Sequence, residues 1–214
     1  MNRDAILHRV RTALGRSAQS PVAAPPALPG RVRIPVAERV ARFRLALEGL
    51  GGTVEFAGSP EEARTVVKRL LAGRTAVAAD HPFLTTCGIG GIAGVEKGIT
   101  DREEWRRACA ERAVGVTSAD YALAETGSLV LMAAPNSPRL ASLLPLTHIA
   151  VVPLECLLSD IWEFYALHPR ALDETPSVVF VTGPSRTADI EQILVRGVHG
   201  PGHLHVVFVE EASA

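Results

Sequence analysis

The chain of 214 residues has few cysteines, and their positions exclude most protein-bound redox centres. It contains three, Cys87, Cys109 and Cys156, an odd number at wide spacings. They therefore form neither a disulfide framework nor the closely spaced pairs that hold zinc or an iron–sulfur cluster. We expect no iron–sulfur cluster on this chain, so any redox centre with which it works must come from elsewhere, and its cofactor is unknown.

An excess of one charge and long apolar runs are also missing. The 22 Lys and Arg residues are matched by 23 Asp and Glu, a formal net charge of −1, so no global field attracts nucleic acid or anionic lipid. No apolar run approaches the roughly 20 residues of a spanning helix, and the amino terminus leads into an amphipathic stretch rather than a signal-peptide core. We expect a cytoplasmic protein that binds neither nucleic acid nor membranes.

Prolines are concentrated near the amino terminus. Apolar residues lie four apart between residues 2 and 14, which is helical spacing, whereas residues 16–35 carry five prolines, a density that excludes helix and central strand. We predict an arm of a helix and an extended linker, residues 1–35, followed by one domain, residues 36–214. The arm either packs back on the body or docks on a partner subunit, so a homo-oligomer is one assembly that it allows.

From residue 36 onward, helical periodicity alternates with short β-branched runs. This alternation is typical of an α/β fold. The runs are apolar throughout, which favours strands buried on both faces of a largely parallel sheet. Helices are predicted at 36–50, 59–71, 101–113, 137–144, 154–167 and 187–195. Strands are predicted at 53–56, 75–79, 128–132, 148–152, 177–181 and 204–209.

A glycine-rich segment spans residues 87–99. Its Gly88–Gly91 stretch matches neither the G-x-G-x-x-G fingerprint of dinucleotide sites nor a P-loop. We therefore interpret the segment as a flexible surface loop or lid rather than a nucleotide site.

Two carboxylates, Asp120 and Glu125, lie among hydroxyls and glycines in residues 115–128, which run into a buried strand. This pattern suits a pocket where the backbone approaches a ligand closely and a carboxylate serves as base or nucleophile. The structural alternative is that Asp120 caps a short helix and that Thr126–Gly127 is its exit turn.

A strand, a Gly-Pro-Ser turn and a predicted helix start follow one another in residues 178–191. Unpaired N–H groups at a helix start favour a phosphate or carboxylate, and Arg186 adds a fork-shaped donor. Ligands of parallel α/β folds commonly lie at the carboxyl ends of strands. An ordinary N-cap at Ser185 or Thr187, with acids in the first turn, is compatible with the same pattern.

Three histidines, His199, His203 and His205, fall within seven residues. Imidazoles bind zinc or iron, but no cysteine or acid lies at ligand spacing, so we expect no metal. His199 is instead expected to face a ligand from its glycine- and proline-rich turn. His148, at the start of a predicted strand, either reaches a cleft or is a satisfied core histidine.

Four separated motifs, in order, resemble the lactate-utilisation protein C family (the LUD domain). They are Thr117–Ser128, Ser137–Arg139 with Leu146–Ile149, Gly183–Glu191, and Gly197–Pro201. The resemblance covers roughly residues 40–210. It implies a three-layer α/β/α fold similar to CoA transferases and sugar-phosphate isomerases, and a role with two partner proteins in oxidising L-lactate to pyruvate. The iron–sulfur motifs of that family lie on the partners.

The resemblance also carries over the polar members of these motifs as lining of the family's site, without settling their individual roles. We take Glu125, Asp120 and His199 as candidate catalytic residues. The candidate ligand-binding residues are Thr126, Gly127, Ser128, Gly183, Ser185, Arg186, Thr187, Asp189 and Glu191.

Three functions are compatible with these residues. In the first, the chain is a non-cluster subunit of a lactate-oxidising system that holds a small anion between Ser185–Arg186 and Glu125, near His199. In the second, it is a CoA-transferase- or sugar-phosphate-isomerase-like enzyme in which Glu125 attacks a thioester or acts with Asp120 in proton transfer. In the third, it is a non-catalytic metabolite-binding or assembly module whose arm docks a partner.

Overall fold

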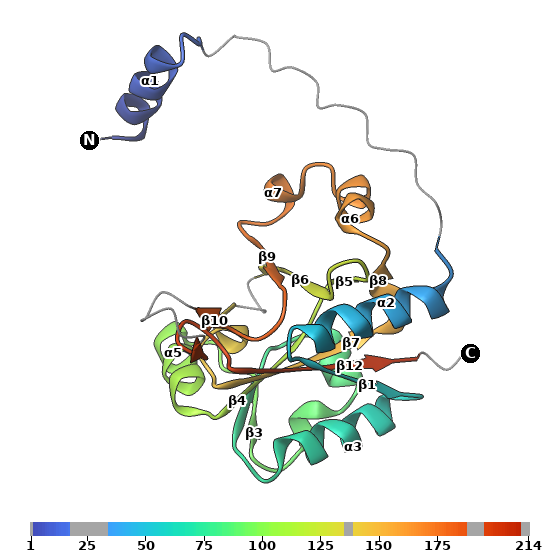
Figure 1. Cartoon of the computed structure of the whole chain (residues 1–214). Helices are drawn as coiled ribbons and strands as arrows, with labels where there is room; N and C mark the ends of the chain where they lie inside the picture. Colours follow the sequence, from blue (N-terminus) through green and yellow to red (C-terminus); the bar gives the residue numbers. More distant parts are fainter. Residues whose placement is uncertain (1, 18–33, 135–138, 188–194, 211–214) are drawn as a thin grey trace. The chain divides into compact units, whose positions relative to one another are not determined.

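The computed structural model describes most of the chain, and Figure 1 shows its course. The described residues are 2–17, 34–134, 139–187 and 195–210. The chain divides into two compact units, Met1–Arg31 and Val32–Ala214. The first contains α1 (Arg3–Ala13), none of whose residues is buried, and the Asn2 side chain caps it by accepting a hydrogen bond from the Ala5 N–H at 2.9 Å.

The second unit is built around a parallel sheet of six strands in the order β1-β12-β7-β4-β2-β3. The strands are β1 (Thr53–Ala57), β12 (His203–Val209), β7 (Thr147–Pro153), β4 (Val114–Ser118), β2 (Ala76–Ala78) and β3 (Val95–Glu96). The central strands are almost wholly buried, as apolar runs without alternation predict. The predicted α/β fold with a mostly parallel sheet is confirmed.

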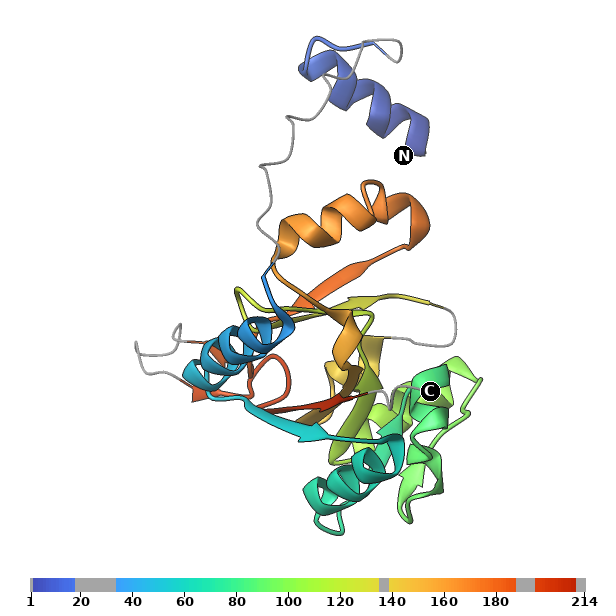
Figure 2. The ribbon, with the colours of Figure 1, turned by 90° about the vertical axis from the view of Figure 1, so that its right-hand side faces the viewer.

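Helices and a second sheet cover the two faces of this sheet (Figure 2). One face packs against α3 (Pro60–Leu71) and α4 (Pro82–Thr86). The other packs against α2 (Val36–Gly49), α5 (Arg102–Glu111) and four further strands. The amino terminus of α3 is as predicted, since Ser59 Oγ accepts a hydrogen bond from the Glu62 N–H at 3.2 Å and proline opens the helix.

The second sheet has the order β8-β5-β6-β9 and is mostly antiparallel. Its strands are β8 (Leu157–Leu158), β5 (Tyr121–Leu123), β6 (Ser128–Met132) and β9 (Val178–Val181). The predicted strands at 128–132 and 177–181 therefore form, but their expected place in the parallel sheet is wrong. Only residues 124–127 join β5 to β6, which is too short for a parallel crossover.

The helices predicted at 154–167 and 137–144 differ from the structure. The helix expected at 154–167 is present only as α6 (Ile161–Leu167), because the Asp160 carboxylate accepts a hydrogen bond from the Glu163 N–H at 2.8 Å and starts a new helix there. A short helix, α7 (Ala171–Glu174), follows. The helix expected at 137–144 is a 3-10 turn, η2 (Arg139–Ser142), in its described part.

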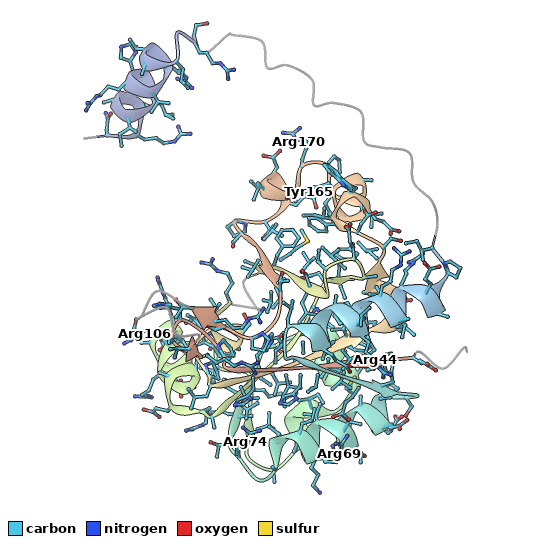
Figure 3. All side chains as sticks on the ribbon, in the orientation of Figure 1. Arg44, Arg69, Arg74, Arg106, Tyr165 and Arg170 are labelled. Carbon is cyan, nitrogen blue, oxygen red and sulfur yellow. The ribbon has the colours of Figure 1, made fainter. Side chains whose placement is uncertain are left out.

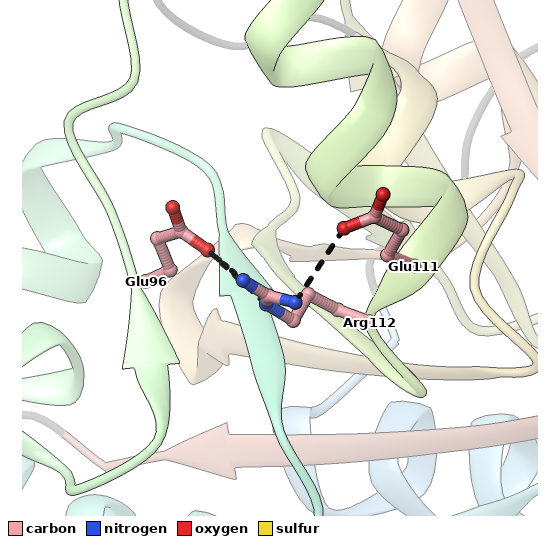
Figure 4. Close-up of polar contacts among 3 residues, drawn as sticks. All are labelled: Glu96, Glu111 and Arg112. Atoms are coloured by element: carbon pink, nitrogen blue, oxygen red, sulfur yellow. Dashed lines mark hydrogen bonds and ion pairs between the residues drawn. The ribbon is translucent and has the colours of Figure 1, made fainter.

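The glycine-rich segment 87–99 is folded rather than a loose lid. It contains a 3-10 turn, η1 (Ile89–Gly91), with Ile89 buried, and the edge strand β3. Figure 4 shows how that strand is tied to α5: Arg112 Nη2 lies 2.9 Å from Glu96 Oε2, and Arg112 Nη1 lies 3.9 Å from Glu111 Oε2. The buried isoleucine holds this segment against the core, which is why its glycine content alone wrongly predicted a flexible loop.

No helix in the described part of the chain is long and apolar enough to cross a membrane.

Candidate functional site

The motifs that contain Gly127 and Gly183 both pack against the carboxyl end of α2. Because α2 ends just before β1 begins, this end of the helix lies at the edge of the parallel sheet where the strands start, which we call the amino edge. Gly127 has φ +65°, and a Cβ added there would lie 2.6 Å from the Leu47 nitrogen. A Cβ added at Gly183, φ +89°, would lie 3.0 Å from Leu50 Cβ. Only glycine tolerates these backbone conformations at such close approach.

A chain of hydroxyls joins the same two motifs. Thr126 Oγ1 lies 2.7 Å from Ser128 Oγ, which in turn lies 2.7 Å from Thr182 Oγ1. Ser128 is buried, so these bonds satisfy a hydroxyl that has lost its water. Glu125 directly precedes Thr126, the first of these hydroxyl residues. It is exposed, and its backbone N–H donates to the Ser159 carbonyl at 3.0 Å.

Backbone hydrogen bonds connect the second motif to the His199 turn. The Ser185 N–H donates to the Pro201 carbonyl at 2.8 Å, and the Gly197 N–H donates to the Ser185 carbonyl at 3.0 Å. The Gly202 N–H donates to Leu146, the residue before β7, at 3.0 Å. The turn that carries the exposed His199 therefore lies at the amino edge of the parallel sheet, rather than at the carboxyl ends of its strands, where ligands of such folds commonly lie.

The helix predicted at 187–195 is wrong at both of its described ends. Arg186–Thr187 is a short strand, β10, which pairs antiparallel with β11 (Val195–Arg196). Asp189 and Glu191 lie outside the described residues. Because Thr187 is extended, an anion at Ser185–Thr187 would be held by side chains rather than by the N–H groups of a helix start there.

The antiparallel pair of β10 and β11 places two arginines directly opposite each other. Arg186 and Arg196 are Cα partners, and residues directly opposite in an antiparallel pair project on the same face. Across the described residues, neither guanidinium forms an ion pair with a carboxylate. Arg196 lies over the end of α2, where a Cβ added at Gly51 would be 2.9 Å from its Nη2, a position that the helix dipole favours for a cation.

Asp120 is not brought to this edge. Its Oδ2 accepts a hydrogen bond from the Met132 N–H at 2.7 Å, so Asp120 ties the turn between β4 and β5 to the last residue of β6 rather than capping a helix. It follows Ser118, the last residue of β4, whose Cα partner in β7 is Val151. Along β7, Val151 lies five residues after Leu146, a distance of about 16 Å at about 3.3 Å for each residue. Asp120 therefore lies at the carboxyl edge, opposite to His199.

A cavity of about 260 Å³ surrounds Asp120, and we call it the carboxyl-edge cavity. It is lined by Asp80, His81, Pro82, Ser118, Asp120, Leu131, Met132 and Ala134. His81 Nδ1 accepts a hydrogen bond from the Phe83 N–H at 3.2 Å. Burial lowers the pKa of His81, and the nearby charge of Asp120 opposes that shift. His81 was not among the site residues predicted from the sequence. The pattern that could have indicated it is the polar pair Asp80 and His81, followed by Pro82, shortly after the buried strand β2.

His148 is a core residue rather than part of a cleft. It is 0% exposed in β7, and its Nε2 lies 2.8 Å from Thr117 Oγ1, whereas its Nδ1 has no partner. Burial, reinforced by His205, lowers the pKa of His148 to about 4. The ring is therefore neutral at pH 7, and only one of its nitrogens is satisfied.

The remaining histidines of the third motif do not form a metal cluster with His199. His205 Nδ1 lies 2.6 Å from Thr53 Oγ1, and Arg74, beyond the end of α3 (Figure 3), donates from Nη1 to Thr147 Oγ1 at 3.0 Å. Burial, His203 and Arg74 all lower the pKa of His205. Within the described ranges, no group of three His, Cys, Asp or Glu residues could hold a metal ion.

A wider groove of about 710 Å³ lies between α3 and the glycine-rich segment. Its Arg64 donates to the Gly91 carbonyl at 2.9 Å, and burial raises the pKa of the Cys87 thiol to about 11. The thiol is therefore protonated at pH 7 and is a poor nucleophile.

The fold and these sites define an α/β protein with a parallel central sheet that carries separate polar clusters at its two edges. The chain belongs to the LUD domain family, whose model matches residues 40–209. The resemblance inferred from the four motifs is thereby confirmed.

Its relatives include proteins named lactate utilization protein C. The one from Halalkalibacterium halodurans is 41% identical over 102 residues, which cover 46% of this chain and 44% of the relative. The one from Bacillus velezensis is 32% identical over 171 residues, covering 73% and 70%. This chain therefore matches less than half the length of the first relative.

A crystal structure of a DUF162 family protein from Deinococcus radiodurans has the same fold, with a TM-score of 0.64. It is 19% identical, and the match covers 83% of this chain and 99% of that one.

Proposed function

We propose that the protein is a component of an L-lactate utilisation system and that it binds a small carboxylate anion at the amino edge of the parallel sheet. The names of its relatives support the role in lactate utilisation. The site is proposed around Ser185, Arg186 and His199, with Glu125 and its neighbouring hydroxyl chain on the side of α2.

The observation that carries this proposal is the cross-strand pair of Arg186 and Arg196. Like charges directly opposite on a ribbon repel each other, and a carboxylate between them relieves that repulsion. Arg196 already lies at the negative end of α2, so Arg186, which is exposed and has no carboxylate partner among the described residues, is the guanidinium that we propose binds the ligand. Its planar fork matches a carboxylate in a bidentate geometry.

The oxidation needs an electron acceptor, which we propose lies on a second protein. Conversion of L-lactate to pyruvate releases two electrons and two protons, and the three cysteines of this chain lack the spacing of a cluster site. We propose that Arg186 holds the carboxylate, that His199 takes the hydroxyl proton, and that the Cα hydrogen leaves with the electron pair as a hydride to an acceptor on an iron–sulfur partner protein. Glu125 is proposed as a second polar group facing the ligand.

Reconstitution of L-lactate-dependent dye reduction tests the role. The candidate iron–sulfur partners would be assayed with the full chain, without it, and the chain would be assayed alone. We expect activity only when the chain and its partners are combined. Full activity of the chain alone, or full activity of the partners without it, would contradict the subunit role.

A further inference from the structure

The groove between α3 and the glycine-rich segment, which we call the α3 groove, is large enough for a metabolite. Its volume of about 710 Å³ falls within the roughly 300–1,000 Å³ of small-molecule sites. Cys87 and Ile92, both buried, form an apolar floor. Arg64 and Lys68 are exposed on α3 and line the same groove. The lining therefore combines an apolar floor with two cations that a ligand can reach.

Two glycines of this segment are explained by cationic side chains rather than by the backbone. Neither Gly90 nor Gly91 has a positive φ, so their backbones would accept other residues. A Cβ added at Gly90 would lie 2.1 Å from Lys97 Cδ, and one added at Gly91 would lie 3.3 Å from Arg64 Nη2. The Arg64 guanidinium also donates to the Gly91 carbonyl at 2.9 Å. Glycine at these positions therefore leaves the room in which two cationic side chains lie across the segment.

The charges of these cations are not neutralised by carboxylates of the protein. Among the described residues, none of Arg64, Lys68 and Lys97 forms an ion pair. Of the lining residues only Glu61 is acidic, and hydrogen bonds from its own backbone N–H and from the Ser59 hydroxyl lower its pKa. Glu61 lies seven residues before Lys68, about 10 Å along the helix axis. An anion between Arg64 and Lys68 would therefore meet two positive charges, with Glu61 on the far side of Arg64.

Two neighbouring cations match a doubly charged group. Residues four apart on a helix have their Cβ atoms about 5–6 Å apart, so one ligand group can contact both Arg64 and Lys68. A carboxylate brings a single charge, whereas a phosphate monoester carries close to two charges at neutral pH and three acceptor oxygens. The guanidinium fork binds two of these oxygens, and the ammonium group acts as a point charge.

We propose that the α3 groove is a second binding site of this protein and that it takes a small phosphate monoester. The phosphate lies on Arg64 and Lys68, and the organic part covers the apolar floor. The groove is larger than a phosphate ion needs, which favours an ester over the free ion.

Glycine amides provide separate probes of the two proposed sites. Gly88 and Gly91 line the α3 groove, whereas Gly127 and Gly183 pack at the amino edge. The full chain labelled with ¹⁵N at glycine would be titrated with glycerol 3-phosphate, dimethyl phosphate or inorganic phosphate at constant ionic strength and about pH 8. We expect glycerol 3-phosphate to cause a saturable shift of the groove amides and no shift of the amino-edge amides.

The other two compounds test charge and shape. Dimethyl phosphate carries one charge and should bind about tenfold more weakly, the effect of losing a charge-assisted hydrogen bond. Inorganic phosphate has no organic part to cover the apolar floor and should bind about threefold more weakly.

Substitutions of the two cations locate the phosphate. Arg64→Gln and Lys68→Gln should each weaken glycerol 3-phosphate binding about tenfold, because each removes a charge-assisted hydrogen bond. Arg69→Gln is the matched control, since it removes a cation from the same helix (Figure 3). Arg69 is not among the lining residues and pairs with Glu55 instead, so its substitution should leave the affinity unchanged.

Each other outcome contradicts the proposal. Absence of a saturable shift of the groove amides would mean that the groove binds no phosphate, and a shift confined to the amino-edge amides would place the phosphate there. Equal affinity for dimethyl phosphate would mean that the second charge is not recognised, and equal affinity for inorganic phosphate would mean a site for the free ion. Equal losses in Arg64→Gln and Arg69→Gln would mean attraction by the overall charge of α3 rather than a site.

Discussion

The two edges of the same parallel sheet carry opposite chemistry. At the amino edge, backbone hydrogen bonds join two glycine-containing turns, and two arginines face each other without a carboxylate partner among the described residues. At the carboxyl edge, carboxylates line a cavity, and the buried hydroxyl of Ser118 beside it has no partner among the described residues. The comparison distinguishes the edge of the proposed anion site from the edge that carries these carboxylates, and it divides residues that lie only a few positions apart in one motif.

The amino edge depends on close backbone approach, and Gly127→Ala should disrupt it most. The new Cβ would meet the Leu47 nitrogen at 2.6 Å in addition to the strain of φ +65°. We expect a loss of about 3 kcal/mol or more in the free energy of unfolding, measured in urea. Gly73→Ala is the matched control, because Gly73 has φ +78° with no atom within 4 Å, and it should lose only about 1 kcal/mol. Equal losses would show that contact with α2 is unimportant.

His148 should give the fold a measurable pH dependence. Burial lowers its pKa from 6.5 to about 4 in the folded state, so the unfolded chain binds the proton more readily between these values. The contribution of the neutral His148 ring to the free energy of unfolding is therefore complete above pH 6.5. It is lost as the pH falls toward 4, and the loss amounts to about 3 kcal/mol in all.

Urea unfolding of the His148→Gln variant from pH 7 to 4 would isolate the pH dependence that His148 gives to the free energy of unfolding. His205 is the titratable neighbour that acts on His148, and its pKa is itself lowered, so the wild type and the variant must be compared at each pH. The variant should show a shallower decline. Identical slopes would mean that the ring is not kept neutral by burial.

Two buried serines sharpen the contrast between the edges with a smaller effect. Ser128 has two hydroxyl neighbours at 2.7 Å, whereas Ser118 has no partner. Ser128→Ala should therefore cost about 1–2 kcal/mol of unfolding free energy, and Ser118→Ala should be within about 0.5 kcal/mol of wild type or slightly stabilising. If both variants lost the same stability, the Ser118 hydroxyl would have a partner after all.

Local signals predicted much of the fold and part of the site. The alternation of helical and β-branched segments gave the α/β class, and the Ser59–Pro60 signal gave the start of α3. Parts of the motifs 117–128, 183–191 and 197–201 gather at one edge, and whether their side chains act on a ligand stays a prediction.

The remaining features depend on contacts between distant residues. The β5–β6 hairpin starts at the carboxyl edge, makes its turn at the amino edge and returns, so one motif sends Asp120 and Gly127 to opposite ends of the sheet. The pairing of Arg186 with Arg196 is a matter of strand register, which no short pattern around either residue encodes. His81 was missed because a single histidine beside a proline has no distinctive spacing.

Calorimetric titration of the full chain with L-lactate tests the central claim, that the guanidinium of Arg186 at the amino edge holds the anion. Arg186→Gln should weaken binding about tenfold or more, because a charge-assisted hydrogen bond is lost. Arg170→Gln removes the same charge from an exposed position beside α7 (Figure 3) and should leave binding unchanged. Equal affinities of the Arg186→Gln variant and wild type, or equal losses in both variants, would contradict the claim.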